Sequence, residues 1–345
     1  MSLRTLALTL FTLIASGFIL VIGKDLLIQL TFALLFWFLI KGMRNAMVNI
    51  PGIGKFVPRW IWTSISIVFL FGVVVVVINL ILSNLASLES NTAVYTENAR
   101  DFTTRIQDYI GMDISKYLPD FMESGYLQKL ISQAAGMLSN GLSATFMVII
   151  YAMFMFSEES NFSEKITSVI EDGTKRDHVR KALGEIDSST MNFLGLKTLI
   201  GLVTGGASYI ILYFMEIDAA LFWAFLIFLF NYIPFVGSLI ATLFPSIFAV
   251  FQFGDLYHPL MIFGLIEVVQ ILVGNVLEPR VMGKSLNLSS LVVIISLSFW
   301  SALWGIPGAF LSIPLTVVMV IIFKQFKSTV PFAKILSEKG TLEHE

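Results

Sequence analysis

One long apolar stretch, residues 260–277, contains polar residues at helical spacing. Glu267, Gln270, Gly274 and Glu278 are 3, 4 and 4 positions apart, which places them on one face of a helix. A carboxylate near the middle of a membrane span is costly unless it is paired, hydrated or protonated. This stripe therefore predicts a cation or proton site. A structural hydrogen bond between buried helices is the alternative.

Two residues at the end of this stretch extend the predicted site. Asn275 flanks the stripe and offers a side-chain amide. Glu278 lies beside Arg280, so a local ion pair explains Glu278 about as well as a binding role does.

Proline and glycine interrupt two long apolar runs in a repeated pattern. The first run contains FW-x9-IP-x10-P and the second contains FW-x5-IP-x6-P. Pro234 and Gly237 break the first run, and Pro307 and Gly308 break the second. Paired, interrupted hydrophobic segments at matching positions are typical of transporter binding sites.

Each interruption can bind a solute. Proline removes a backbone donor and frees carbonyls, which can coordinate a cation or a polar solute. The half-helix that follows presents a partly positive N-terminus. We therefore expect Asn231, Pro234 and Gly237 at one break, and Pro307 and Gly308 at the other, to contact substrate. A kink used only for packing is the alternative for a single break.

The sequence disfavours several other kinds of chemistry. It contains no cysteine, which excludes disulfides and thiolate chemistry. Neither the phosphate-binding G-x-x-x-x-G-K-[ST] pattern nor an H-E-x-x-H zinc motif occurs. We expect a protein that is not an enzyme, has no metal site, binds no nucleic acid and uses no cofactor beyond a coupling H+ or Na+.

The composition predicts the fold class. Hydrophobic residues make up 56% of the 345 residues and charged residues only 13%, and the mean hydropathy is +0.83. Soluble domains carry about 25% charged residues. We therefore predict an all-α polytopic membrane protein. No A-x-A-like cleavage site follows the first apolar run, which indicates a retained span and not a removed signal peptide.

The apolar runs predict about six full spans, since a spanning helix needs about 20 apolar residues. These are residues 5–23, 26–40, 61–82, 141–157, 198–215 and 260–277. Two further runs are too long for one span: the first broken segment, residues 219–253, and the second broken segment, residues 288–325. Each is expected to form two helical arms joined at its Pro/Gly break.

Lysine and arginine in the short loops predict the orientation. Residues 41–60 contain four basic residues and no acid, so this loop is expected in the cytoplasm, with both chain termini on the same side. The first broken segment then enters and leaves from the outside, and the second from the inside. We expect two oppositely oriented hairpins whose tips, residues 231–237 and 304–308, meet within the protein.

The predicted spans and the basic residues of the loops together divide the chain into five regions. An outside segment with two or three amphipathic helices and a break at residues 111–119 follows three spans. A fourth span then leads to a cytoplasmic helical segment, a transport core with both hairpins, and a cytoplasmic tail. The regions are residues 1–82, 83–140, 141–197, 198–327 and 328–345.

The motifs resemble a known family. The runs FNYIPFVGSLIATLFP (230–245) and GNVLEPRVMGKSLNLSSLVVIISLSFWSALWGIPGAFLSIPL (274–315) are similar to the autoinducer-2 exporter family, also described as PerM-like transporters. The N-terminal half agrees with that family in span order and in the long polar segment after the third span. The resemblance implies a plasma-membrane (inner-membrane) transporter that forms a homo-oligomer, with a pentamer as one expected assembly.

Family members are linked to autoinducer-2 export or to sodium (lithium)/proton antiport, so the resemblance leaves two functions open. One is gradient-driven export of a small polar solute bound at the two hairpin tips. The other is antiport with Glu267 as the ion-coupling carboxylate. A non-transporting scaffold assembled through residues 83–140 ranks third.

Overall fold

The described part of the chain is helical throughout. The computed structural model describes residues 3–51, 56–110, 126–170, 172–282, 288–326, 328–338 and 340. Six of its helical stretches are long and apolar enough to cross a membrane: Lys24–Val48, Arg59–Ser90, Gly173–Phe214, Val236–Phe253, Tyr257–Val281 and Ser290–Gln325. Helices satisfy their backbone hydrogen bonds internally, as an apolar solvent requires. The structure therefore confirms an all-α chain with the helices of a multi-pass membrane protein.

These six crossing helices match the predicted full spans 26–40, 61–82, 198–215 and 260–277 but not 5–23 and 141–157, and the other two come from the two broken segments. Helices nevertheless overlap all six predicted full spans. They are α1 (Leu3–Ile22), α2 (Lys24–Val48), α3 (Arg59–Ser90), α6 (Tyr126–Ser168), α7 (Gly173–Phe214) and α10 (Tyr257–Leu272). α10 continues through the π-helical segment Val273–Leu277 into α11 (Glu278–Met282). The extension of α6 and α7 has a simple cause, because polar residues flanking the apolar runs are good helix formers.

The chain divides into two compact units. Unit 1 comprises Met1–Thr63, Ala144–Gly195 and Lys284–Glu345, and unit 2 comprises Ser64–Ser143 and Leu196–Gly283. The first broken segment belongs to unit 2, as α8 (Ala220–Phe230) and α9 (Val236–Phe253). The second belongs to unit 1, as α12 (Ser290–Gln325), which is followed by α13 (Val330–Leu336). The predicted meeting of the two tips remains a prediction.

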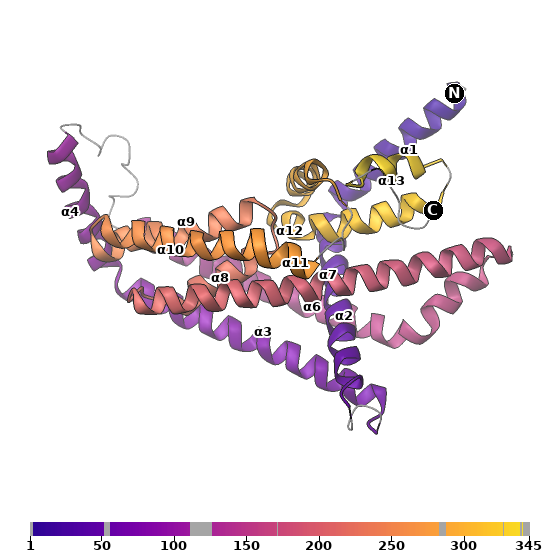
Figure 1. Ribbon diagram of the computed structural model, residues 1–345, viewed down its shortest axis with the longest axis horizontal. Helices are drawn as coiled ribbons and strands as arrows, with labels where there is room; N and C mark the ends of the chain where they lie inside the picture. Colours follow the sequence, from indigo (N-terminus) through magenta and orange to yellow (C-terminus); the bar gives the residue numbers. More distant parts are fainter. Residues whose placement is uncertain are drawn as a thin grey trace. The chain divides into compact units, whose positions relative to one another are not determined.

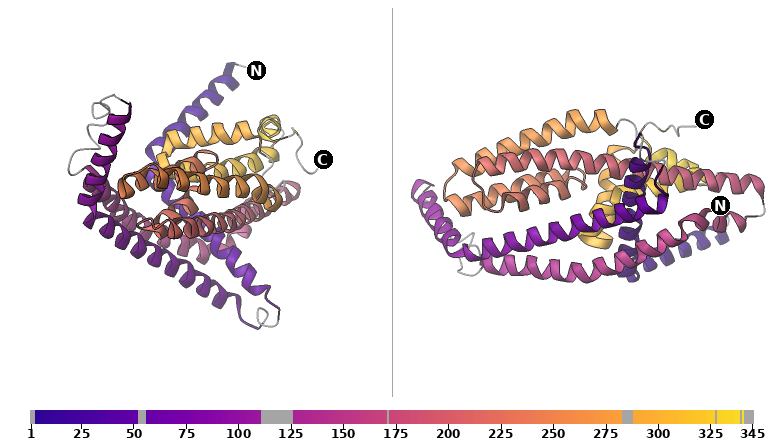
Figure 2. Two further views of the ribbon diagram at one scale, coloured as in Figure 1. Left: turned by 60° about the vertical axis from the view of Figure 1, so that its left-hand side comes forward. Right: turned by 90° about the horizontal axis from the view of Figure 1, so that it is seen from below.

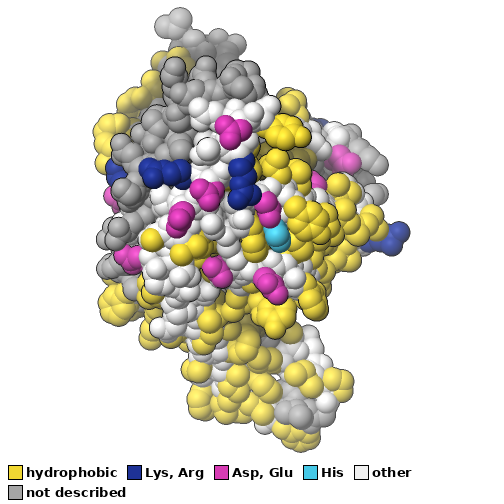
Figure 3. All heavy atoms as spheres, turned by 90° about the vertical axis from the view of Figure 1, so that its left-hand side faces the viewer, with side chains coloured by type: hydrophobic (Ala, Val, Ile, Leu, Met, Phe, Trp, Pro, Cys, Tyr) yellow, Lys and Arg dark blue, Asp and Glu magenta, His cyan; other side chains and the backbone are white. Residues whose placement is uncertain are grey.

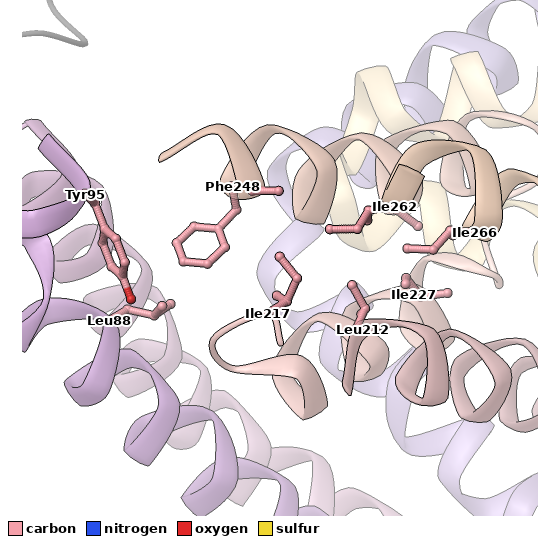
Figure 4. Close-up of a cluster of buried hydrophobic side chains, with 10 residues drawn as sticks. Leu88, Tyr95, Leu212, Ile217, Ile227, Phe248, Ile262 and Ile266 are labelled. Carbon is pink, nitrogen blue, oxygen red and sulfur yellow. The ribbon is translucent and has the colours of Figure 1, made fainter. Parts of the chain in front are cut away.

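Unit 2 is built around a cluster of apolar side chains (Figure 4). Leu212 of α7, Ile227 of α8, and Ile262 and Ile266 of α10 are each fully buried in this cluster. In Figure 4 Ile227 and Ile266 lie close together. These side chains hold α7, α8 and α10 together.

Two glycines allow α7 and α8 to approach closely (Figure 1). A Cβ at Gly201 would lie 2.9 Å from Cδ2 of Phe228, and one at Gly205 would lie 3.0 Å from the carbonyl oxygen of Ala224. Small residues four apart permit this backbone contact between membrane helices. The α7–α8 pair is thereby fixed in register up to the end of α8.

Helix α4 (Thr92–Ile110) packs on the turn between α7 and α8 and on the end of α9. Tyr95 donates a hydrogen bond to Oδ2 of Asp218 (2.6 Å), and Nδ2 of Asn98 donates to the carbonyl oxygen of Gln252 (2.6 Å). Burial and the bond to Asp218 both raise the pKa of Tyr95, so the phenol remains a donor. Figure 2 shows α4 turning away from the end of α3, and Figure 3 shows charged side chains gathered on the face that carries α4. The predicted break at residues 111–119 lies outside the described residues.

Unit 1 holds a network of charges between α2, α6 and α7. Arg44 donates to both carboxylate oxygens of Glu159, at 2.8 and 2.7 Å, and Lys41 donates to Asp187 at 2.6 Å. Burial raises the pKa of Glu159, but the bond and charge of Arg44 outweigh that effect and leave it lowered. Residues predicted on one side of the membrane therefore meet in this unit.

Candidate functional site

The first break, residues 231–235, is a strained turn between α8 and α9. The N–H of Val236 donates to the carbonyl oxygen of Pro234 at 2.6 Å, which closes a three-residue γ-turn. The central residue, Phe235, has φ 57° and ψ −60°, a conformation that is rare and strained for a side chain of this size. Backbone strain of this kind concentrates at functional sites.

Gly237 allows the start of α9 to lie close against the end of α8. A Cβ at this position would lie 1.9 Å from the carbonyl oxygen of Phe230, well inside van der Waals contact. Gly237 itself is buried, whereas Pro234 is half-buried. These two predicted site residues therefore shape the turn and bring Asn231 to its position.

Lys197 is a functional candidate that the sequence expectations do not include, except as the end of the segment 141–197. Its side chain is only 7% exposed, and its ammonium contacts Oε1 of Glu278 at 2.5 Å and the carbonyl oxygen of Asn231 at 3.3 Å. A buried lysine in a membrane helix requires such partners, because an uncompensated charge there is costly. One sequence signal was available, since Lys197 precedes Gly201 by four residues and so shares the face that contacts α8.

Glu278 therefore has a partner from a distant part of the chain. It begins α11, directly after the π-helical segment Val273–Leu277, and its ion-pair partner is Lys197, 81 residues earlier. A π-helical turn inserts an extra residue and shifts which side chains share a face. Asn275 lies within that turn and is exposed.

Three predicted residues carry a buried polar atom without a hydrogen-bond partner among the described residues. The atoms are Nδ2 of Asn231, Oε2 of Glu267 and Nε2 of Gln270. Gln270 is only 8% exposed as a whole. A buried polar group without a partner costs about 1–3 kcal/mol, so such groups call for an explanation such as a bound ligand.

Contacts at the first break join α7, the end of α8 and α11. Asn231 follows Ile227 by one turn at the end of α8, and Gln270 follows Ile266 by one turn on α10. Lys197 of α7 joins Asn231 to Glu278 of α11. We refer to Lys197, Asn231, Glu267, Gln270 and Glu278 as the polar cluster.

The second break, residues 304–308, lies inside α12 and also has a glycine close to a backbone carbonyl oxygen. Gly305 adopts φ 66° and ψ −141°, which essentially only glycine tolerates. A Cβ at Gly308 would lie 1.9 Å from the carbonyl oxygen of Trp300, which matches the contact at Gly237. Pro307 is half-buried and Gly308 is buried.

The surroundings of the second break are apolar, and their polar groups have partners. Trp300, Trp304 and Leu311 form a buried cluster, and Nε1 of Trp304 donates to the carbonyl oxygen of Leu20 at 3.0 Å. Ser296 on the first arm bonds to Ser312 on the second at 3.1 Å, which joins the arms directly. No buried side-chain nitrogen or oxygen of α12, which is described along its whole length, lacks a partner.

The described residues do not form a metal centre. No group of three or more histidine, cysteine, aspartate or glutamate side chains is close enough to hold a metal ion in the described ranges.

Comparison with known proteins places the chain among transporters. Residues 7–328 match the model of a protein family described as "AI-2E family transporter". The AI-2 transport protein TqsA of Escherichia coli strain K12 is 30% identical over 290 residues, which cover 82% of each chain. A putative transport protein of Haemophilus influenzae is 30% identical over 299 residues, covering 82% of this chain and 83% of that protein. The putative permease PerM of Escherichia coli is 37% identical over 71 residues, or 21% of this chain and 20% of that protein.

Proposed function

Because this chain belongs to the AI-2E transporter family, we propose that it is an ion-gradient-driven secondary transporter that exports a small polar solute resembling AI-2. Membership makes it a transporter and not an enzyme. The polar cluster at the first break is the solute site in this proposal. The observation that carries the proposal is the set of buried, unpartnered atoms on Asn231, Glu267 and Gln270.

The proposal includes a membrane arrangement. The two broken segments form hairpins that enter from opposite faces of the inner membrane, both chain termini are cytoplasmic, and the protein works as a homo-oligomer. Contacts between regions predicted on the same side support this arrangement. Arg44 pairs with Glu159, both predicted near the cytoplasm, and Tyr95 bonds to Asp218, both predicted outside.

The position of the polar cluster fits export. Lys197 and Phe214, the last residue of α7, are separated by roughly 26 Å of helix at 1.5 Å per residue. That length is close to the hydrocarbon thickness of about 30 Å. In this proposal Lys197 therefore lies at the cytoplasmic end of the apolar part of α7, where a solute made in the cell arrives. Movement of the broken segments then exposes it to the other side.

A second function is favoured by one atom of the same site. Oε2 of Glu267 is a buried carboxylate oxygen without a partner among the described residues, as a proton- or sodium-coupling acid would be. In this alternative the protein is a sodium (lithium)/proton antiporter with Glu267 as its ion-coupling carboxylate.

Reconstitution of the purified protein in liposomes distinguishes the two functions. We expect uptake of labelled AI-2 driven by a proton or sodium gradient, with no Na+-dependent proton flux of comparable rate. Robust Na+-dependent proton flux that Glu267→Gln abolishes would instead establish antiport. If neither solute moves under any gradient, both functions are excluded.

A further inference from the structure

The short helix α13 presents an apolar face to its surroundings, directly after the long apolar helix α12. Pro331, Phe332 and Ile335 are exposed on α13, with Phe332 at 58% and Ile335 at 73%. At 3.6 residues per turn these three residues lie within about 100° of one another, on the side opposite the fully buried Ala333. Clustered exposed apolar side chains of this kind mark an interaction surface.

Hydrogen bonds to both ends of α12 fix the orientation of this face. The N–H of Thr329 donates to the carbonyl oxygen of Phe326 (2.9 Å), and its hydroxyl donates to that of Phe323 (2.7 Å). At the other end of α13, the N–H of Ser289 donates to the carbonyl oxygen of Leu336 (3.2 Å). Ser289 is the residue before α12 and Phe326 is the residue after it, so α13 is bonded to both ends of that helix.

The apolar face of α13 continues the outward surface of α12. Met319, Ile322 and Phe326 are exposed and lie 3 and 4 positions apart, so they form one stripe along the end of α12. The ring centroids of Phe323 and Phe332 are 6.5 Å apart, which places α13 beside the end of this stripe. Because α12 is long and apolar enough to cross a membrane, lipid is the expected cover of its exposed stripe. The same lipid is then the nearest cover for the face of α13.

The charges around α13 fit the headgroup region of a membrane. Residues 324–336 contain three lysines and no acid: Lys324, Lys327 and Lys334. Lys324 is paired with Glu185 (3.0 Å), so this segment and its partner together carry three positive charges and one negative charge, or +2. Membrane-surface helices combine lysines with inserted apolar side chains, and anionic lipids attract them. Because α12 already holds α13 in place, the short helix needs no membrane affinity of its own.

We infer that α13 is a membrane-surface helix, which inserts Pro331, Phe332 and Ile335 into the leaflet beside the end of α12 and places its lysines among anionic headgroups. In the arrangement proposed above, this is the cytoplasmic leaflet. Helix α13 thereby holds both ends of the second broken segment at the membrane surface. Its partner is lipid, so the inference does not depend on which solute the protein moves.

The test uses single cysteines, because the chain contains none of its own. Ile335→Cys in the full chain is labelled with the polarity-sensitive dye NBD and reconstituted in phosphatidylcholine vesicles with about one quarter phosphatidylglycerol. We expect blue-shifted emission, and quenching by lipids with a doxyl group near the headgroup that is at least about twofold stronger than for labelled Val169→Cys. Val169 is the matched control, because it is 82% exposed in the same unit and follows the end of α6, about 17 Å of helix beyond the predicted span 141–157.

A second probe and a change of lipid complete the test. Phe332→Cys reports on the same face if the label at residue 335 disturbs folding, and each variant must give a monodisperse size-exclusion profile. Vesicles without phosphatidylglycerol should weaken the quenching at both positions, since the lysines then lose their anionic partners. Equal quenching in the two lipids would overturn the role given to the lysines.

Two further outcomes would overturn the inference as a whole. Water-like emission without quenching would show that the face of α13 is open to solvent. Blue-shifted emission without quenching by the doxyl lipids would show that protein covers it, a second copy of this chain included.

Discussion

The two broken segments share a steric device but differ in their polar surroundings. At each break a glycine presses its Cα against a carbonyl oxygen of the preceding arm, Gly237 against Phe230 and Gly308 against Trp300, with the same 1.9 Å to a hypothetical Cβ. At both breaks, therefore, backbone lies against backbone at a position without a side chain. The repeated proline and glycine pattern of the sequence encodes this shared geometry.

The two breaks differ in whether their buried polar atoms have hydrogen-bond partners among the described residues. The first break carries polar atoms on Asn231 and Gln270 that have no partner among the described residues, and a buried lysine bonded to its backbone. At the second break Trp304 donates to Leu20, and Ser296 joins the two arms. The comparison suggests a division of labour, in which the first break binds solute and the second is a packed reversal that supports movement.

The largest expected effect concerns the close contact between a glycine and a carbonyl oxygen at each break. Gly237→Ala and Gly308→Ala each place a methyl group against backbone, which cannot move as a flexible side chain can, and we expect each to cost more than about 3 kcal/mol. Size-exclusion profiles and melting temperatures in detergent should show little folded protein for either variant. Gly264→Ala on α10 is the control, because a Cβ there meets nothing within 4 Å. A normal melting temperature for only one of the two variants would show that the breaks are not sterically equivalent.

The next prediction contrasts backbone strain at the two breaks. Gly305 accommodates its positive φ without penalty and Phe235 does not, so Gly305→Ala should destabilise the protein by about 1–3 kcal/mol, while Phe235→Gly should stabilise it. Phe235 is 60% exposed, so its removal loses little packing. Thermal unfolding should show a lower melting temperature for Gly305→Ala and a higher one for Phe235→Gly. If Phe235→Gly also lowers the melting temperature, the ring of Phe235 contributes packing that outweighs the strain.

Much of the fold was predictable from the sequence because apolar runs of sufficient length have few alternatives in a membrane. The six predicted full spans overlap helices, the first Pro/Gly break falls between α8 and α9, and the second falls at a kink inside α12. The family was also predictable, because the motifs around Pro234 and Pro307 are specific in combination. Family membership alone leaves the site residues untested.

The pairing within the site was harder to predict. The link between Lys197 and Glu278 spans 81 residues, and no local pattern reports such a contact. The π-helical segment changes the helical phase before Glu278, so spacing along an ideal helix does not predict its partner. The sequence also did not predict which face of α4 is buried. That face contacts the turn at Asp218, which is far away in sequence.

A smaller effect tests the proposed division of labour directly. Gln270→Leu removes an amide from the polar cluster while keeping its volume, so we expect AI-2 uptake to fall about tenfold, which corresponds to about 1.4 kcal/mol. Its melting temperature should not fall, because the lost amide has no partner among the described residues. Trp304→Phe removes the bond to Leu20 and should show the reverse, with lower stability and normal uptake per folded molecule. Reduced uptake in folded Trp304→Phe protein would place the second break in the solute path.

The smallest expected effects come from the hydrogen bonds that hold each break together. Ser296→Ala removes the bonds of Ser296 to the carbonyl oxygen of Ser312 and to the hydroxyl of Thr316, and Thr198→Val removes the bond of Thr198 to the hydroxyl of Tyr232 (2.6 Å), next to Asn231. Each lost bond should lower the stability by about 0.5–1.5 kcal/mol, since that is the net contribution of one such bond. Only Thr198→Val should also weaken the apparent affinity for AI-2, because only that bond orders a residue adjoining the polar cluster. Concentration-dependent uptake of both variants, normalised to folded protein, measures this difference. Equal affinities in the two variants would show that the ordering of Tyr232 is irrelevant to solute binding, and would confine the site to the polar cluster itself.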